Sequence, residues 1–207
     1  TPPDQGGGSR RADIVFLMDN SGSMDGEINA VSANVRNFVD QMALAGIDFA
    51  LGLCRFGSSQ NSGNPIIEDN GILTQNTTYF KDVVWARNSA YGSYEPGWDA
   101  LYESTTSFTF RPGSQKVFIL ITDENVSEDD NDGTYTQAQA ITALQNNSVT
   151  TFALIELDNT SVQDYGYIAE QTNGEYYDIY SDFSDVLTAI SSQVSNSYLV
   201  RYRTNHP

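Results

Sequence analysis

Cysteine and histidine are almost absent from this chain. Cys54 is the sole cysteine, so an internal disulfide is excluded, and its place in an apolar run predicts a buried core thiol. His206 is the sole histidine and lies near the end of the chain, outside the expected core. A Ser-His-Asp hydrolase needs a histidine beside its nucleophile, so we do not expect an enzyme of that class.

Positive charge is also scarce. Lys and Arg together number 10 against 27 Asp and Glu, which gives a formal net charge of −17. Nucleic-acid phosphates need basic partners and anionic membranes repel acidic surfaces, so we expect no nucleic-acid binding. No apolar run approaches the roughly 20 residues of a membrane span, so direct membrane insertion is not expected either. An acidic surface instead favours cations.

Short apolar runs alternate with helical patterns along the chain. The runs at 13–18, 47–54 and 117–121 are apolar on both faces, which is typical of buried parallel strands. We therefore predict an α/β fold: a Rossmann-like, open, mostly parallel sheet with one antiparallel edge strand and helices on both faces. A hairpin is expected around Asp69-Asn70-Gly71, and an edge strand at 175–179.

The sequence predicts that the two ends of the chain lie outside the folded domain. Residues 1–11 are predicted to be a flexible linker, 12–197 one domain, and 198–207 a strand-like exit towards a following domain. We therefore expect a monomeric domain within a multidomain chain. The abundance of Asn, Ser, Thr, Gly and Tyr favours an extracellular or cell-surface protein of bacterial origin. A protein without disulfides is also compatible with the cytoplasm.

Oxygen-bearing side chains follow the first apolar strand. In Asp19-Asn20-Ser21-Gly22-Ser23, a carboxylate and two hydroxyls alternate directly after that strand. Mg²⁺ and Ca²⁺ prefer such ligands. The alternative interpretation is a helix cap, because Ser, Asp and Asn are common before helices.

Two further carboxylates are expected at the same edge of the sheet. Asp123 follows the strand at 117–121, and Glu95 lies at a loop-to-helix junction. Parallel sheets bind ligands beyond the carboxyl ends of their strands, so these acids are predicted to lie near Asp19.

The pattern Asp-x-Ser-x-Ser, matched by Asp19, Ser21 and Ser23, resembles the metal-ion-dependent adhesion site of von Willebrand factor type A domains. This family includes the inserted domains of integrins, and the similarity covers roughly residues 12–196. The resemblance implies Asp123 as the last metal ligand and Glu95 where many members have Thr. Ser93 is the alternative ligand at that loop.

The resemblance also implies a function. A domain of this family would bind one divalent cation, Mg²⁺ or Ca²⁺ with Mn²⁺ as a further possibility, and a carboxylate of a protein partner would complete its coordination. The surrounding contact residues would be Asn20, Met24, Ser93, Tyr94 and Glu124. Three carboxylates around the ion favour tolerance of Ca²⁺. The alternative function is an intracellular assembly subunit that docks on an ATPase or chelatase partner through the same site.

Other acids near the motif allow a second metal site. Asp25 and Glu27 follow the motif, and Asp130 and Asp132 belong to an acidic run that resembles the start of a calcium loop. That loop would need a Glu where Gln139 stands. A solvated helix face and a solvated acidic loop are the competing interpretations.

Overall fold

The fold is centred on one six-stranded sheet, seen in a computed structural model that describes residues 11–57, 65–90, 92, 95–124, 133–181, 188 and 192. The strand order is β3-β2-β1-β4-β5-β6. The strands are β1 Arg11–Asp19, β2 Asp48–Phe56, β3 Ile66–Ile67, β4 Gln115–Ile121, β5 Val149–Ile155 and β6 Tyr176–Asp178. Only β3 pairs antiparallel, with β2, so the predicted mostly parallel sheet with one antiparallel edge strand is confirmed.

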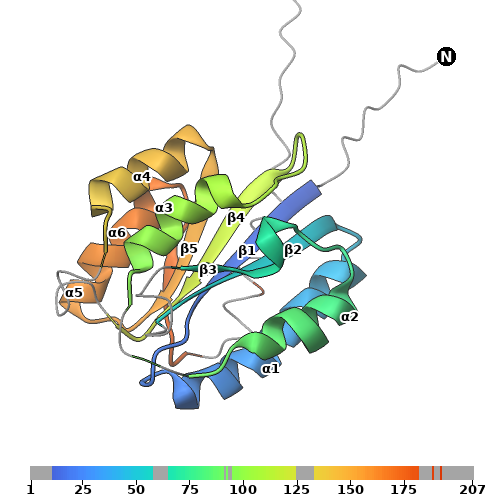
Figure 1. Ribbon diagram of the computed structural model, residues 1–207, viewed down its shortest axis with the longest axis horizontal. Helices are drawn as coiled ribbons and strands as arrows, with labels where there is room; N and C mark the ends of the chain where they lie inside the picture. The colour runs from blue at the N-terminus through green and yellow to red at the C-terminus, as the bar shows by residue number, and fades with distance from the viewer. Residues whose placement is uncertain are drawn as a thin grey trace, which may run out of the picture.

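Helices cover both faces of this sheet, as Figure 1 shows. Helices α1 and α2 lie on one face, and α3, α4 and α6 on the other. The helical segments are α1 Asp25–Leu44, α2 Thr77–Tyr79 continued by Phe80–Val84 and Trp85–Arg87, α3 Gly97–Ser107, α4 Gln137–Asn146, and α5 Asn159–Ser161 continued by Val162–Gly166 and α6 Tyr167–Gln171.

Strand β1 divides two hydrophobic cores. Ile14, Phe16 and Met18 pack into the core under α1, whereas Val15 and Leu17 pack into the core under α3, α4 and α6. Because successive strand residues point to opposite faces, an uninterrupted apolar run serves both cores at once. The central strand is therefore fixed on both sides, and so is the residue at its end.

The pairing register sets which side chains meet at the carboxyl edge of the sheet. Met18 pairs with Ile121 of β4, and Asp19 pairs with Phe56 of β2. The residues that follow β4 and β2 therefore emerge on either side of Asp19. This places Asp123 and Gly57 next to the end of β1.

The predicted hairpin around Asp69-Asn70-Gly71 is wrong. Ile66 and Ile67 pair with β2, and after the turn Thr74 pairs with Leu51 of the same strand. Asp69, Asn70 and Gly71 have φ of 50°, 54° and 75°, so three successive left-handed residues return the chain to the β2 edge instead of folding it on itself.

The remaining structural expectations concern an edge strand and the two ends of the chain. The edge strand expected at 175–179 is confirmed as β6. The linker at 1–11, apart from its last residue, and the exit at 198–207 lie outside the described residues.

A buried ion pair joins the strand beginnings at the opposite edge. Asp13 in β1 is fully buried and accepts bonds from the backbone N and Nε of Arg111, both at 2.6 Å. Arg111 Nη1 also donates to Asp48 Oδ1 of β2 at 2.6 Å. This arginine therefore connects β1, β2 and the segment between α3 and β4.

Removing the Arg111 side chain is expected to destabilise the fold strongly. Arg111→Ala leaves the Asp13 carboxylate buried without its partner, which costs about 3–5 kcal/mol of unfolding free energy. Arg36→Ala, which breaks the exposed pair with Asp82, should cost about 1 kcal/mol or less. Urea unfolding of both variants measures the difference, and equal losses would show that the Asp13 pair is not a structural anchor.

Candidate metal centre

Asp19 is a fully buried carboxylate at the end of β1. Its Oδ1 accepts the backbone N–H of Ser21 at 2.8 Å, and its Oδ2 accepts the hydroxyl of Thr122 at 2.7 Å. Burial raises the pKa of Asp19 to about 7, although both hydrogen bonds favour the charged form. The carboxylate is thus held in one orientation by amide and hydroxyl donors, and no Lys or Arg of the described residues donates to it in these bonds.

A line of oxygens runs from Ser21 to Asp123. The hydroxyls of Ser21 and Ser23 lie 2.8 Å apart, and the Ser23 hydroxyl donates to Asp123 Oδ1 at 3.1 Å. Ser21 is buried, Ser23 is exposed and Asp123 is half-buried. The structure therefore brings together Asp19, Ser21, Ser23 and Asp123, four of the five residues proposed from the sequence as metal ligands.

Glu95 reaches the same cluster from the segment before α3. Burial, followed by the negative charges of Asp19 and Glu124, raises the pKa of Glu95 to about 8, while a hydrogen bond with the Ser21 side chain opposes the shift. Burial also raises the pKa of Asp123. Glu95 is therefore placed to join the site, whereas the alternative ligand Ser93 lies outside the described residues.

The donor set fits a hard divalent cation. Burial, and to a lesser degree mutual repulsion, raises the pKa of all three carboxyls, and a bound cation would favour their charged forms. Within the described residues, however, no three His, Cys, Asp or Glu side chains converge closely enough to hold an ion by themselves. A cation would therefore need the Ser21 and Ser23 hydroxyls, and water, for part of its coordination.

Two residues expected to contact a partner are instead internal supports. Asn20 is 1 % exposed and Met24 is 0 % exposed, so neither side chain faces an incoming ligand. Asn20 donates its backbone N–H to Phe56 O at 2.7 Å and its Nδ2 to Ser89 O at 3.2 Å. The chain turns inward directly after Asp19, which residue type alone does not reveal.

The other expected contact residues and the second metal site are placed only in part. Glu124 is half-buried at the rim, and its backbone N–H donates to the Thr122 hydroxyl at 3.1 Å. Asp25 is exposed in the first turn of α1, and Glu27 lies near Asp123. Tyr94, Asp130 and Asp132 lie outside the described residues.

Gly57 and Thr122 are functional residues that sequence reasoning missed. Gly57 follows β2 with φ 115°, and a Cβ there would lie 2.5 Å from Ser21 N and 2.7 Å from Asp19 Oδ1. Thr122 holds the second oxygen of Asp19. The signal available for both residues was that each directly follows a predicted strand, because those strands end at the same edge of the sheet as β1.

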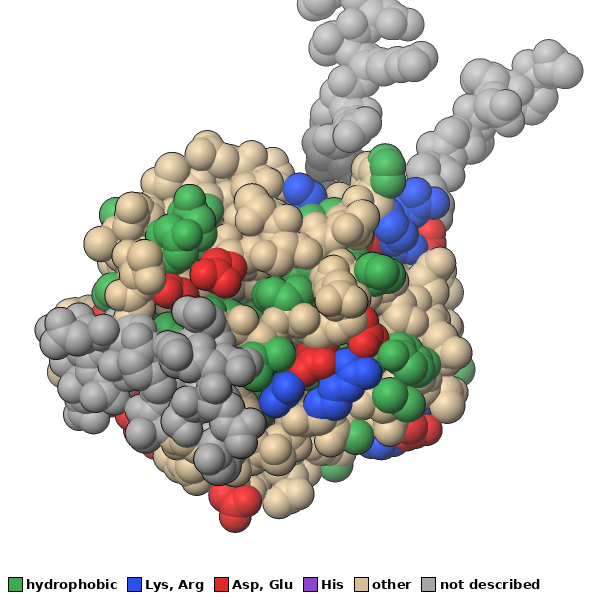
Figure 2. Space-filling model, viewed as in Figure 1, with side chains coloured by type: hydrophobic (Ala, Val, Ile, Leu, Met, Phe, Trp, Pro, Cys, Tyr) green, Lys and Arg blue, Asp and Glu red, His purple; other side chains and the backbone are tan. Residues whose placement is uncertain are grey.

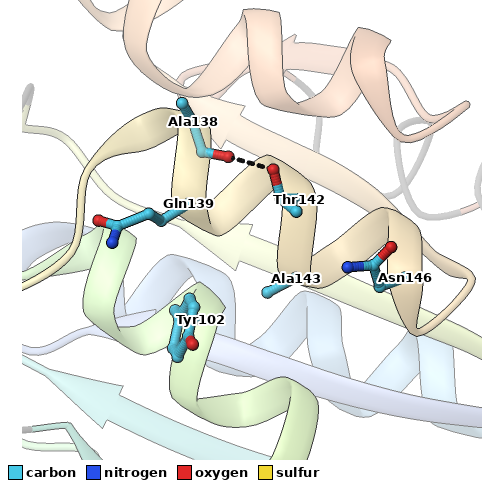
Figure 3. A pocket seen from close by; sticks show the side chains of 6 residues that line it. All are labelled: Tyr102, Ala138, Gln139, Thr142, Ala143 and Asn146. Atoms are coloured by element: carbon cyan, nitrogen blue, oxygen red, sulfur yellow. Dashed lines mark hydrogen bonds between the residues drawn. The ribbon is translucent and has the colours of Figure 1, made fainter.

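A shallow hollow between α3 and α4 is separate from this cluster. Figure 3 shows its lining side chains, of which Tyr102 comes from α3 and the others from α4. Its volume is about 340 Å³, and the lining residues are Tyr102, Ala138, Gln139, Thr142, Ala143 and Asn146. None of them belongs to the cluster around Asp19.

The sequence matches the von Willebrand factor type A domain family over residues 13–193. No curated protein matches the chain significantly. Solved structures at 16–20% identity are similar in fold, and each comparison covers 89% of this chain.

Three of these structures differ in their source and in how much of their length is matched. A von Willebrand factor type A protein from Catenulispora acidiphila is 18% identical, with a TM-score of 0.68 and 42% of that chain covered. Proximal thread matrix protein 1 from the mussel byssus is 20% identical, with a TM-score of 0.70 and 48% covered. The pilus adhesin SpaC from Lactobacillus rhamnosus GG is 16% identical, with a TM-score of 0.65 and 30% covered. This chain thus spans less than half the length of these three.

A methyl group at position 57 is expected to displace the loop that carries Ser21. Gly57→Ala should lower the affinity for Mg²⁺ or Ca²⁺ about tenfold or more, because the new Cβ overlaps Ser21 N and Asp19 Oδ1. Gly113→Ala is the matched control, since Gly113 also has positive φ but its Cβ meets nothing within 4 Å. Calorimetric titration measures both, and equal affinities would contradict the role of Gly57.

The raised pKa values predict how stability depends on pH. Folding holds protons on Asp19 and Glu95 up to about pH 7 and 8, above their ordinary values of 3.8 and 4.5. In a chelator the contribution of these two groups to stability is therefore complete at low pH and is lost as the pH rises through 5 to 8, which lowers Tm by roughly 5 °C or more over that range.

Saturating Ca²⁺ should remove that loss, because proton and cation compete for the same oxygens. Calorimetric melts with Ca²⁺ and with EDTA across this pH range make the comparison. A Tm in EDTA that rises between pH 5 and 8 would contradict the assignment.

Proposed function

Because the chain belongs to the von Willebrand factor type A domain family, we propose that it is a metal-dependent protein-binding module of a larger extracellular protein. Asp19, Ser21 and Ser23, with Glu95 and Asp123, would hold one divalent cation, and a carboxylate of the partner would complete its coordination. The observation that carries the proposal is the line of oxygens from buried Asp19 through the two serines to Asp123.

Each residue of the site has a separate task in this function. Ser21 N–H and the Thr122 hydroxyl hold the two oxygens of Asp19, so this carboxylate is oriented before any ligand arrives. Ser23 is exposed and faces Asp123, which marks the side from which a partner can approach. Bound Mg²⁺ or Ca²⁺ supplies the positive charge that attracts a carboxylate.

We further propose that the site binds and does not catalyse. A hydrolytic reaction would need a general base that stays free while the cation is bound, and in this proposal Asp19 and Glu95 are occupied as ligands of the cation. Within the described residues, the side chains that act on the pKa values of Asp19 and Glu95 are acids and hydroxyls, and no Lys takes part. Charge of one sign around a cation suits recognition.

The extracellular setting is part of the same proposal. The pilus adhesin and the byssus matrix protein are both named for roles outside the cell, which supports an adhesive module. Among the described helices, none combines the length and the apolar character needed to cross a bilayer. The electron-rich donor set favours Ca²⁺ and Mg²⁺, with Mn²⁺ as a usable substitute.

The proposed function predicts binding that needs both a cation and a carboxylate. We would apply labelled protein to an array of short peptides that each carry one Asp or Glu, beside matched peptides with Asn or Gln. Binding in Mg²⁺ or Ca²⁺ should exceed binding in EDTA at least about tenfold and should be confined to the acidic peptides.

Asp19→Ala should abolish this binding, whereas Glu170→Gln, a change at an exposed acid of α6, should leave it intact. Circular dichroism confirms that each variant is folded. Peptide binding that persists both in EDTA and in Asp19→Ala would refute the metal bridge.

A further inference from the structure

The first turn of α3 contains a buried carboxylate that the metal centre does not use. Asp99 is 4 % exposed and lies four residues after Glu95. Its Oδ1 accepts the backbone N–H groups of Thr134 at 3.0 Å and of Tyr135 at 2.8 Å, and its Oδ2 also accepts that of Thr134, at 2.8 Å. Burying a carboxylate is costly unless donors satisfy it, so Asp99 and these two residues hold each other in place.

The two donors belong to the far end of the loop that follows Asp123. This loop leaves β4 and leads into α4, whose N-cap is Thr136. A Cβ at Gly133 would lie 2.8 Å from Asp99 Oδ1, so the loop can approach the carboxylate this closely because Gly133 has no side chain. Asp99 therefore joins the beginning of α3 to the loop that carries Asp123.

An aromatic stack strengthens the same connection. The ring of Tyr135 lies nearly parallel to that of Tyr102 in α3, with centroids 3.7 Å apart and 13° between the ring planes. Figure 3 shows Tyr102 on the side of α3 next to α4. Stacked rings add to the free energy gained from burial alone. The end of the loop is thus fastened to α3 by two independent kinds of contact.

Backbone N–H groups, and not a basic side chain, supply these bonds to Asp99. Figure 2 shows most Lys and Arg side chains of this face beside acidic ones and away from α3 and α4. Backbone donors cannot turn away from a carboxylate as a flexible Lys side chain can. The connection made by Asp99 therefore fixes the course of the chain on both sides of it.

The backbone between Asp99 and Glu95 has little freedom of its own. Tyr165, which is 2 % exposed, packs against Gly97 so closely that a Cβ there would overlap its hydroxyl. Pro96 precedes Gly97, and the ring of a proline fixes its φ. Gly97 N–H also donates to Glu95 O at 2.7 Å. Where the first turn of α3 is held, the backbone of Glu95 is therefore held as well.

We propose that Asp99 is a positioning residue of the metal centre, whose bonds to the far end of the loop hold Glu95 at a fixed place relative to Asp123. This inference rests on the proposed function and deepens it by naming a residue that sets cation affinity without touching the cation. Asp19 and Asp123 each belong to the end of a strand or follow one, whereas Glu95 depends on where a helix begins. A ligand that is already in place is not ordered at the moment of binding, so the cation binds more tightly.

The competing interpretation is that Asp99 only stabilises the fold. Acids in the first turn of a helix interact favourably with the helix dipole, and the bonds of Asp99 also support the chain just before α4. In that case, its loss would lower the free energy of unfolding but leave the cation affinity of the folded protein unchanged. Cation affinity, measured on protein that is shown to be folded, therefore separates the two interpretations.

Calorimetric titration with Mg²⁺ or Ca²⁺, on variants that circular dichroism shows to be folded, tests the inference. Asp99→Ala should lower cation affinity about tenfold, as is common when a residue that supports a metal ligand is removed. Asp99→Asn, which keeps the size of the side chain and one acceptor oxygen, should lose less. Gly133→Ala should also weaken binding, because its Cβ would push against Asp99 Oδ1 from the side of the loop.

Thr136→Ala is the matched control. Thr136 follows Tyr135 directly and caps α4, but its side chain bonds to Gln139. Its loss should lower Tm, while cation affinity stays within about twofold of the unaltered protein. An equal loss of affinity in Thr136→Ala would show that any disturbance of this segment is enough, and would overturn the specific role of Asp99.

A double-mutant cycle shows whether Asp99 acts through Glu95. Glu95→Gln alone should weaken cation binding. Adding Asp99→Ala to it should cause little further loss, because the ligand that Asp99 positions is already impaired. Two losses that multiply in full would mean that Asp99 acts independently of Glu95, and would overturn the inference.

The remaining outcomes separate this inference from the proposed function. Unchanged cation affinity in folded Asp99→Ala overturns the inference and leaves the proposed function standing. If Asp99→Ala does not fold, Asp99→Asn and Gly133→Ala decide, and unchanged affinity in both overturns the inference. Binding of acidic peptides that persists in EDTA overturns the proposed function, whatever the titrations show for Asp99. Absence of cation binding by the unaltered protein overturns both.

Discussion

Burial of the Asp19 carboxylate at the end of the central strand is the constraint on which the site depends. The strand packs against a hydrophobic core on each face, so Asp19 cannot move outward without disturbing both. A buried carboxylate must be satisfied, and here the loop after β1 and the residue after β4 each supply one hydrogen bond. The loops at the carboxyl edge are thereby gathered around one residue.

The buried carboxylates at the two edges of the sheet have different kinds of partner. At the strand beginnings, the buried carboxylate Asp13 is paired with Arg111, and Arg11 adds a pair with Asp48. At the strand ends, Asp19 is equally buried but has hydroxyl and amide donors in place of a cation. The same fold thus contains a buried carboxylate paired with an arginine at one edge and a buried carboxylate held by amide and hydroxyl donors at the other.

Much of this arrangement follows from local sequence. Apolar runs without alternation predict parallel strands buried on both faces, and oxygen-bearing residues after those runs predict a cluster at one edge. The pairing of Met18 with Ile121 was not needed to expect Asp123 near Asp19, because parallel strands of one sheet end together. Chemistry and topology therefore agree at this edge.

What escaped prediction depends on contacts between distant segments. Gly57 suits its position because a Cβ there would overlap Ser21 N and Asp19 Oδ1, and its place after a strand does not by itself reveal that close approach. Met24 is buried although both of its neighbours in sequence are exposed, and Asn20 is buried because the loop after β1 turns back on the end of β2, where its backbone N–H donates to Phe56 O. The turn at Asp69-Asn70-Gly71 was recognised from the sequence. The segments before and after it, however, both pair with the open edge of β2.

Exposure along the oxygen line also restricts how a partner can reach the site. Asp19 and Ser21 are fully buried, whereas Ser23 is open and Asp123 is half-open. Within the described residues, the open part of the oxygen line is therefore the side of Ser23 and Asp123. The buried half of the cluster determines what can be held there, and the open half determines which partner can arrive.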